Sequence, residues 1–144
     1  MIKNEKQYRI TKAQTRRFGD ALAELDRQER PVNITPQLWR AQCAAARSQL
    51  HSLQEQIEAY ERLQLGKCKE LVLPAVEDLP KTLIRARIAS GMTQEGLARR
   101  LGMKTQQVQR YEATEYESAS FARIRKVVQA LGLRMPKPAR LVRG

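Results

Sequence analysis

Residues 93–112 read T-Q-E-G-L-A-R-R-L-G-M-K-T-Q-Q-V-Q-R-Y-E, and this stretch decides the fold of the C-terminal half of the chain. Thr93 is a typical helix N-cap, and Leu97 and Leu101 lie four residues apart, so residues 94–101 are predicted to form a two-turn amphipathic helix. Gly102 follows, and glycine readily adopts the left-handed backbone that ends a helix. The pattern therefore predicts a short helix that ends in a tight turn.

A second short helix is predicted over residues 104–113. Val108 and Tyr111 lie three residues apart and are expected to point inward. The polar residues Thr105, Gln106, Gln107, Gln109 and Arg110 are left for the other face. Gln can pair with the N6/N7 edge of adenine and Arg with the O6/N7 edge of guanine. Two helices with this outer face predict a helix-turn-helix that reads the major groove of DNA.

The motif resembles the XRE (Cro and phage-repressor-like) helix-turn-helix family. The resemblance runs from Leu83 to Leu131 and rests on Gln94, Ala98, Gly102, Val108 and the Arg110-Tyr111-Glu112 ending. It implies that Gln94 sits at a helix N-terminus against a phosphate, and that Lys104 to Gln107 face the groove with Arg110. It also implies a structural pair between Arg87 and Glu112. The expected DNA-binding residues are therefore Gln94, Lys104, Thr105, Gln106, Gln107 and Arg110.

Two positions depart from the family pattern. Lys104 stands where Ser or Thr commonly caps the second helix, and Thr105 is an alternative cap one residue later. Glu115 and Glu117 occupy the following loop, which in members of the family often touches the DNA backbone. An acidic loop is not expected to make that contact.

The positive charge is concentrated in the C-terminal half. From residue 79 onward there are 14 Lys and Arg against 4 Asp and Glu, whereas residues 1–78 hold 13 against 11. A strongly basic surface displaces counterions from phosphates, so this uneven distribution of charge supports a nucleic-acid partner.

Several other functions are not expected. The first residues lack an apolar signal core and no run is long enough to span a bilayer, which predicts a cytoplasmic protein without membrane contact. Cys43 and Cys68 have no metal-ligand or redox spacing, so no metal is expected. No nucleotide loop or catalytic motif is found. The chain is therefore predicted to be no enzyme and to need no cofactor.

The N-terminal half is predicted to be a helical hairpin. A first helix is expected from a Thr11 cap to about Glu29, and a second from a Thr35 cap to a stop at Gly66. The second helix has apolar residues in alternating steps of four and three, which is a heptad seam. These residues are Trp39, Cys43, Ala46, Leu50, Leu53, Ile57 and Tyr60.

The predicted lengths favour self-association. The second helix would extend roughly 40 Å and the first roughly 27 Å, so the first cannot cover the whole seam. A two-fold dimer would bury the remainder and would also place two reading helices on one DNA face. The alternative is that the seam packs only within one chain.

The predicted fold is all-α, with an antiparallel hairpin followed by a compact four-helix domain. We assign residues 1–66 to the hairpin, 67–79 to a linker, 80–132 to the DNA-binding domain and 133–144 to a flexible basic tail. Residues 70–73 are either a short strand or a hinge. In the last helix, which begins at Ser118 or Ser120, the expected core residues are Phe121, Ile124, Val127, Val128 and Leu131.

The predicted function is a sequence-specific transcriptional regulator, most simply a repressor, which binds double-stranded DNA at an inverted-repeat operator as a homodimer. The alternative is an antitoxin resembling the HigA type, which neutralises a toxin protein through residues 1–66 and autoregulates its operon. A third possibility is nonspecific nucleic-acid packaging, for which steep salt dependence without sequence preference is expected.

Overall fold

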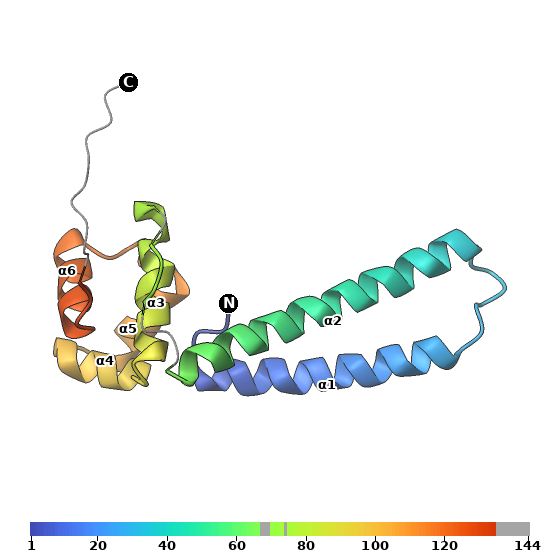
Figure 1. Cartoon of the computed structure of the whole chain (residues 1–144), viewed down its shortest axis with the longest axis horizontal. Coiled ribbons are helices and arrows are strands. Elements are labelled where there is room, and N and C mark those ends of the chain that lie inside the picture. The colour runs from blue at the N-terminus through green and yellow to red at the C-terminus, as the bar shows by residue number, and fades with distance from the viewer. Residues whose placement is uncertain (67–69, 74, 135–144) are drawn as a thin grey trace, which may run out of the picture. The chain divides into compact units, whose positions relative to one another are not determined.

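The computed structural model describes residues 1–66, 70–73 and 75–134. Every regular element in these residues is a helix, which confirms the all-α prediction (Figure 1). The chain divides into two compact units, Met1–Leu65 and Gly66–Gly144. None of the described helices combines the length and the apolar character that crossing a membrane requires.

Helix α1 begins earlier than predicted. It spans Glu5–Arg27, and the side chain of Asn4 caps it by accepting a hydrogen bond of 2.9 Å from the N–H of Gln7. The predicted start at Thr11 is wrong because residues 5–10 contain no glycine or proline that would stop a helix from forming. Asn is an even better cap than Thr, so the helix starts at the first available cap.

Helix α2 spans Pro36–Gln64 and matches the predicted element closely. The Thr35 hydroxyl accepts a hydrogen bond of 3.3 Å from the N–H of Leu38, and Pro36 occupies the first turn, where its missing N–H costs nothing. Gly66 follows the helix with a φ of +61°, the left-handed conformation expected after a helix end.

The two helices pack as an antiparallel hairpin along the predicted seam (Figure 1). All seven seam residues of α2 are buried or half-buried, and Cys43 and Tyr60 are the two that are fully buried. With 23 residues in α1 and 29 in α2, the lengths are roughly 34 Å and 43 Å. The mismatch that favoured self-association through this seam is therefore smaller than predicted, because α1 covers most of it.

Polar contacts join the helices at both ends of the hairpin. The Tyr8 ring stacks on Tyr60 with 5.2 Å between ring centroids, and the Tyr8 hydroxyl donates a hydrogen bond of 2.6 Å to Glu61. Lys12 lies 3.6 Å from the same carboxylate. Towards the loop that joins the helices, Arg47 of α2 pairs with Asp26 of α1 at 2.6 Å. These contacts set the register of the hairpin.

The C-terminal unit contains a short 3-10 turn, η1, and four helices. Their bounds are Val76–Asp78 for η1, Leu79–Ala89 for α3, Gln94–Leu101 for α4, Thr105–Ala113 for α5 and Phe121–Ala130 for α6. Residues 70–73 form no strand, so that alternative is wrong. Linker residues 67–69 and 74, and tail residues 135–144, lie outside the described part of the chain.

The core of this unit lies between the four helices. Leu83 and Ile84 of α3, Leu97 of α4, Val108 of α5 and Val127 of α6 are each less than 2% exposed. Every helix thus contributes at least one fully buried aliphatic side chain, and this shared core fixes the angle between α4 and α5.

Phe121 is not a core residue, although the sequence pattern placed it there. Its side chain is 73% exposed, whereas Ile124 and Val128 are half-buried and Val127 is buried. The Ser120 hydroxyl caps α6, so Phe121 is its first residue. The apolar stripe therefore reaches the core only from the second turn of α6 onward.

The turn between α4 and α5 depends on Gly102, which has a φ of +64°. A Cβ atom added at this residue would meet no atom within 4 Å, so only the backbone conformation disfavours other residues. We expect Gly102→Ala to lower the free energy of unfolding by about 1 to 2 kcal/mol. Gly102→Asn should lower the free energy of unfolding by less than Gly102→Ala, because Asn tolerates the left-handed conformation better than Ala does. Chemical denaturation checks both values, and an Ala variant as stable as wild type would refute this role for the turn.

Candidate nucleic-acid interface

Helices α4 and α5 are each positioned by a local cap. The Thr93 hydroxyl accepts a hydrogen bond of 3.0 Å from the N–H of Gly96 at the start of α4. Lys104 occupies the N-cap position of α5, and its N–H donates to Oε1 of Gln107 at 3.1 Å. Thr105 is the first residue of α5, so the alternative that it caps the helix is wrong. Gln107 supplies the side chain that closes this end.

The outward face of α5 is formed by Gln106 and Arg110. Both side chains are exposed, and they lie one turn apart on the side of the helix opposite the buried Val108 and Glu112. Gln109 is also exposed but lies on the flank of this face, about 60° from Gln106 by helical geometry. Thr105 is half-buried, and Lys104 and Gln107 are exposed at the helix start. Five of the six predicted DNA-binding residues thus lie on or next to α5.

Gln94 differs from the other five because its side chain is buried. It is only 8% exposed, and its Nε2 donates a hydrogen bond of 2.7 Å to Glu112. The side chain therefore belongs to the interior of the domain. A phosphate contact by Gln94 remains a prediction only for its backbone N–H, which lies in the first turn of α4 where N–H groups have no partner within the helix.

A buried ion pair connects α3 to α5. Arg87 donates to both carboxylate oxygens of Glu112, through Nε at 2.5 Å and Nη2 at 2.8 Å, and its Nη1 donates to the carbonyl of Met92 at 2.8 Å. The side chains of Arg87 and Glu112 are 3% and 0% exposed. Together with Gln94, these groups bring α3, α4 and α5 to one point beneath the outward face of α5.

Tyr116 is part of this interior, and sequence reasoning missed it. Glu115 and Tyr116 both have positive φ values, 49° and 60°, which fold the chain back so that the Tyr116 ring stacks on Tyr111 at 6.0 Å. The ring is 3% exposed. Burial raises the pKa of Tyr116 well above its ordinary value, and the Glu112 carboxylate raises it further. A single aromatic residue in a polar segment was the only signal of this contact.

The Tyr116 hydroxyl is buried without a hydrogen-bond partner among the described residues. A buried hydroxyl that loses its bonds to water and gains none in exchange costs about 1 to 3 kcal/mol. We therefore expect Tyr116→Phe to leave the domain as stable as wild type or to stabilise it by up to about 1 kcal/mol. Tyr116→Ala, which also removes the stacked ring, should destabilise it by about 3 to 5 kcal/mol. Urea denaturation of both variants measures these changes. A Tyr116→Phe variant that is less stable than wild type would show that the hydroxyl has a hydrogen-bond partner.

The first acidic residue of the loop after α5 lies close to α3. Glu115 lies 4.0 Å from Lys81 of α3. The same part of the domain has an open surface hollow of about 260 Å³, which is lined by Gln107, Arg110, Tyr111 and Ser118. The hollow adjoins the outward face of α5, because Arg110 belongs to both.

Comparison with known families agrees with this geometry. Residues 83–137 match the family model HTH_3, a helix-turn-helix, over a range that begins in α3 and continues past the end of α6. This part of the chain is a helix-turn-helix domain, and the match supports the resemblance to the XRE family. Its family consists of DNA-binding regulators. The hairpin, α1 and α2, lies outside the match. No curated protein and no solved structure matched the chain.

Proposed function

We propose that this protein is a sequence-specific transcriptional regulator that reads the major groove of DNA with α5. The observation that supports it most directly is the exposed pair Gln106 and Arg110 on the outward face of a helix whose opposite side is anchored in the core. Amide and guanidinium groups are the two side-chain types that distinguish adenine and guanine by paired hydrogen bonds. A solvated helix without a reading role needs neither.

In this proposal the outward residues have separate roles. Gln106 and Arg110 contact base edges, and Thr105 approaches a base methyl group or the groove wall. Lys104 and the backbone N–H of Gln94 contact phosphates and set the register. Gln107 uses its carbonyl oxygen to cap α5, which leaves its amide NH₂ group for the DNA.

The proposed mode of regulation is repression by occupying a promoter, in the cytoplasm where the DNA is. A library of promoters with random sequence between the two polymerase contact elements tests it, with a fluorescent reporter sorted in the presence and absence of the protein. Repressed promoters should share one sequence motif. A shared motif among promoters that become brighter would show an activator, and the absence of any shared motif would contradict specific regulation.

We also propose that the active form is a homodimer on an inverted repeat. A single α5 contacts only a few base pairs, and two copies related by a two-fold axis double both the contact area and the length of sequence that is read. No cofactor is needed for this function.

A second candidate function is neutralisation of a toxin protein, as in HigA-type antitoxins. The observation that favours it is that the hairpin forms a compact unit of its own, outside the matched domain. The two candidates share the same DNA-binding half and differ in what the hairpin binds. Co-expression with the neighbouring open reading frames, followed by purification, should yield a stoichiometric partner only if the antitoxin function is correct.

A further inference from the structure

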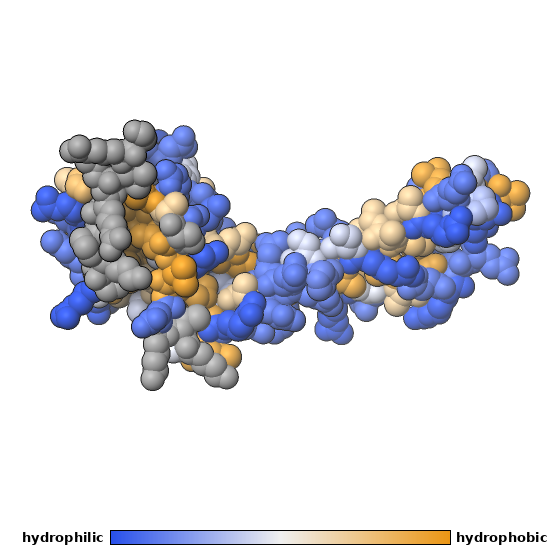
Figure 2. All heavy atoms as spheres, turned by 45° about the horizontal axis from the view of Figure 1, so that its top comes forward, coloured by the Kyte–Doolittle hydropathy of each residue, from blue (hydrophilic) through white to orange (hydrophobic). Residues whose placement is uncertain are grey.

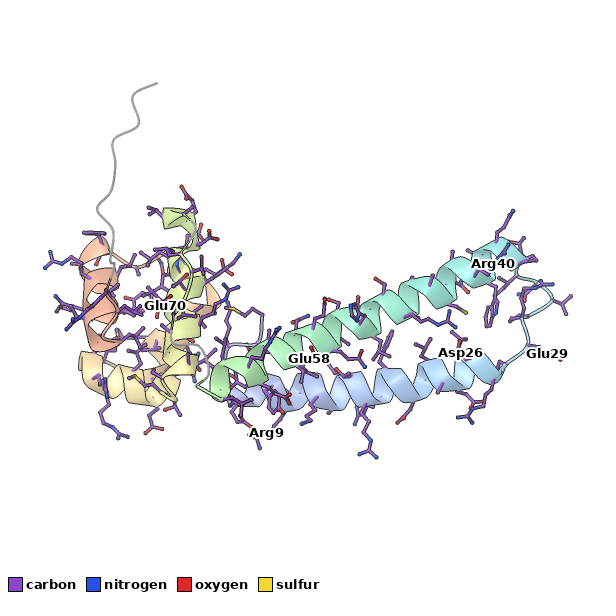
Figure 3. All side chains as sticks on the ribbon, in the orientation of Figure 1. Arg9, Asp26, Glu29, Arg40, Glu58 and Glu70 are labelled. Atoms are coloured by element: carbon purple, nitrogen blue, oxygen red, sulfur yellow. The ribbon has the colours of Figure 1, made fainter. Side chains whose placement is uncertain are left out.

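The hairpin has a charged side, and its ion pairs locate that side. Lys12–Glu61 and Arg47–Asp26 join α1 to α2 along one edge of the seam. Figure 3 labels further charged residues along the hairpin, including Arg9, Arg40 and Glu58. By helical spacing, these residues lie on the same side of the seam as the ion pairs.

On the opposite side of the seam, α1 has an uncharged stripe that is bordered on its outer edge by Arg17 and Glu24. This stripe of residues in steps of four and three lies about a quarter turn from the seam, on the side away from the ion pairs. Its members are Ile10, Gln14, Phe18, Ala21 and Leu25. Ile10 is 48% exposed and Phe18 is 36% exposed, although burial is the common state of such side chains.

Helix α2 has a matching stripe on the same side of the hairpin. Its residues alternate in steps of four and three along most of the helix and are again uncharged: Leu38, Gln42, Ala45, Gln49, Ser52 and Gln56. Leu38 is 51% exposed. All the charged side chains of α2 lie elsewhere on its circumference. We call the two stripes together the neutral face.

The composition of the neutral face decides what can bind it. The face is rich in Gln, Ala and Ser with a few large apolar residues, so it offers neither cations for nucleic acid nor a charge pattern for an acidic or basic protein. Hydrophobic colour on the hairpin in Figure 2 gathers mainly towards its loop end. Small residues allow close approach, and amides hydrogen-bond equally well to copies of themselves.

The seam itself is not fully enclosed by the two helices. Trp39, Leu50, Leu53 and Ile57 remain half-buried between α1 and α2, since two helices alone cannot enclose their common seam. The charged side chains of the ion pairs lie along the other edge. A second layer over the neutral face would complete the burial, as in a four-helix bundle.

We propose that the neutral face is the dimer interface and that its occupant is the neutral face of a second copy of this chain. Two hairpins then form an isologous antiparallel four-helix bundle. Two stripes of this length cover on the order of 600 Å² per copy, which is comparable to the ~800 Å² per partner of stable interfaces. The inference rests on the proposed function as a dimeric DNA-binding regulator, and it identifies the surface through which two chains associate.

Neighbouring alanines provide a matched test. Ala21 and Ala45 belong to the neutral face, whereas Ala23 and Ala44 are also exposed but lie on the charged side. The double variant Ala21→Glu, Ala45→Glu places four carboxylates in the dimer interface. The control Ala23→Glu, Ala44→Glu adds the same charge and the same helix propensities outside it.

Sedimentation equilibrium of the full chain measures the outcome. Wild type and control should have twice the chain mass of 16.5 kDa, and the neutral-face variant should dissociate with a dissociation constant raised at least ~100-fold, at unchanged helical circular dichroism. A monomeric wild type, or equal effects of the two variants, would overturn the interface. DNA binding tests the proposed regulator function separately. A monomer that still prefers one DNA sequence would refute the neutral-face dimer but not the reading of DNA by α5.

Discussion

Glu112→Ala is expected to lower the free energy of unfolding of the C-terminal unit by about 3 to 5 kcal/mol. The substitution removes the acceptor of two Arg87 hydrogen bonds and one from Gln94, and it leaves the Arg87 guanidinium buried at 3% exposure without its counter-charge. The total free energy of unfolding of a small domain is only about 5 to 15 kcal/mol, so this loss removes much of its stability. The cost comes chiefly from the buried cation that is left behind.

The two units of the chain allow the loss to be assigned to the correct place. The single tryptophan of the chain, Trp39, lies in α2, so its fluorescence reports unfolding of the hairpin. Circular dichroism reports both units. Urea should therefore unfold the C-terminal unit of Glu112→Ala at a lower concentration while the fluorescence transition stays in place.

Glu95→Ala is the matched control for this prediction. Glu95 also pairs with an arginine, Arg99 at 3.0 Å, but the two side chains are 69% and 78% exposed. Removing an exposed pair should change the stability by no more than about 0.5 kcal/mol. Similar losses in the two variants would mean that burial of the Arg87–Glu112 pair has no special role.

Arg110→Ala and Gln106→Ala should each weaken binding to the cognate site by about 1 to 3 kcal/mol and change binding to random DNA only slightly. These losses correspond to roughly a 5- to 150-fold rise in dissociation constant at a fixed salt concentration. Both side chains are exposed, so neither substitution should alter the stability of the domain. Fluorescence anisotropy with cognate and scrambled duplexes measures the difference.

Gln109→Ala is the control on the same helix. Gln109 is exposed like Gln106 and has the same side chain, but it lies on the flank of the outward face. Its substitution should cost less than about 0.5 kcal/mol on either DNA, as is usual for a surface position away from any contact. Equal losses on cognate and scrambled DNA for Gln106→Ala or Arg110→Ala would reduce these residues to phosphate contacts.

The helices around the motif were predictable because their local signals agree with one another. Thr93 caps α4, Gly102 adopts the left-handed turn, and Ser120 caps α6, all as the sequence suggested. The same agreement holds in α2, where a cap, a first-turn proline and a heptad pattern point to one helix. Consistent local preferences of this kind are typical of segments that fold without competition.

The misplaced features depend on tertiary contacts or on a choice between local signals. Asn4 and Thr11 are both acceptable caps, and nothing local shows that the earlier one is used. The burial of Gln94 could not be predicted from the sequence, because an amide can bind either a phosphate or a buried carboxylate. Only the fold brings Glu112 to within 2.7 Å of it. Tyr116 enters the core through two consecutive positive φ values in residues that seldom adopt them.

The most direct measurement of the central claim is a selection of binding sites from random duplex DNA at near-physiological salt, run in parallel with wild type and the Gln106→Ala, Arg110→Ala double variant. Reading by α5 predicts that wild type enriches one motif, repeated in inverted orientation, and that the double variant does not enrich it. The same motif from both proteins, or none from wild type, would contradict the assignment of α5 as the element that reads the sequence.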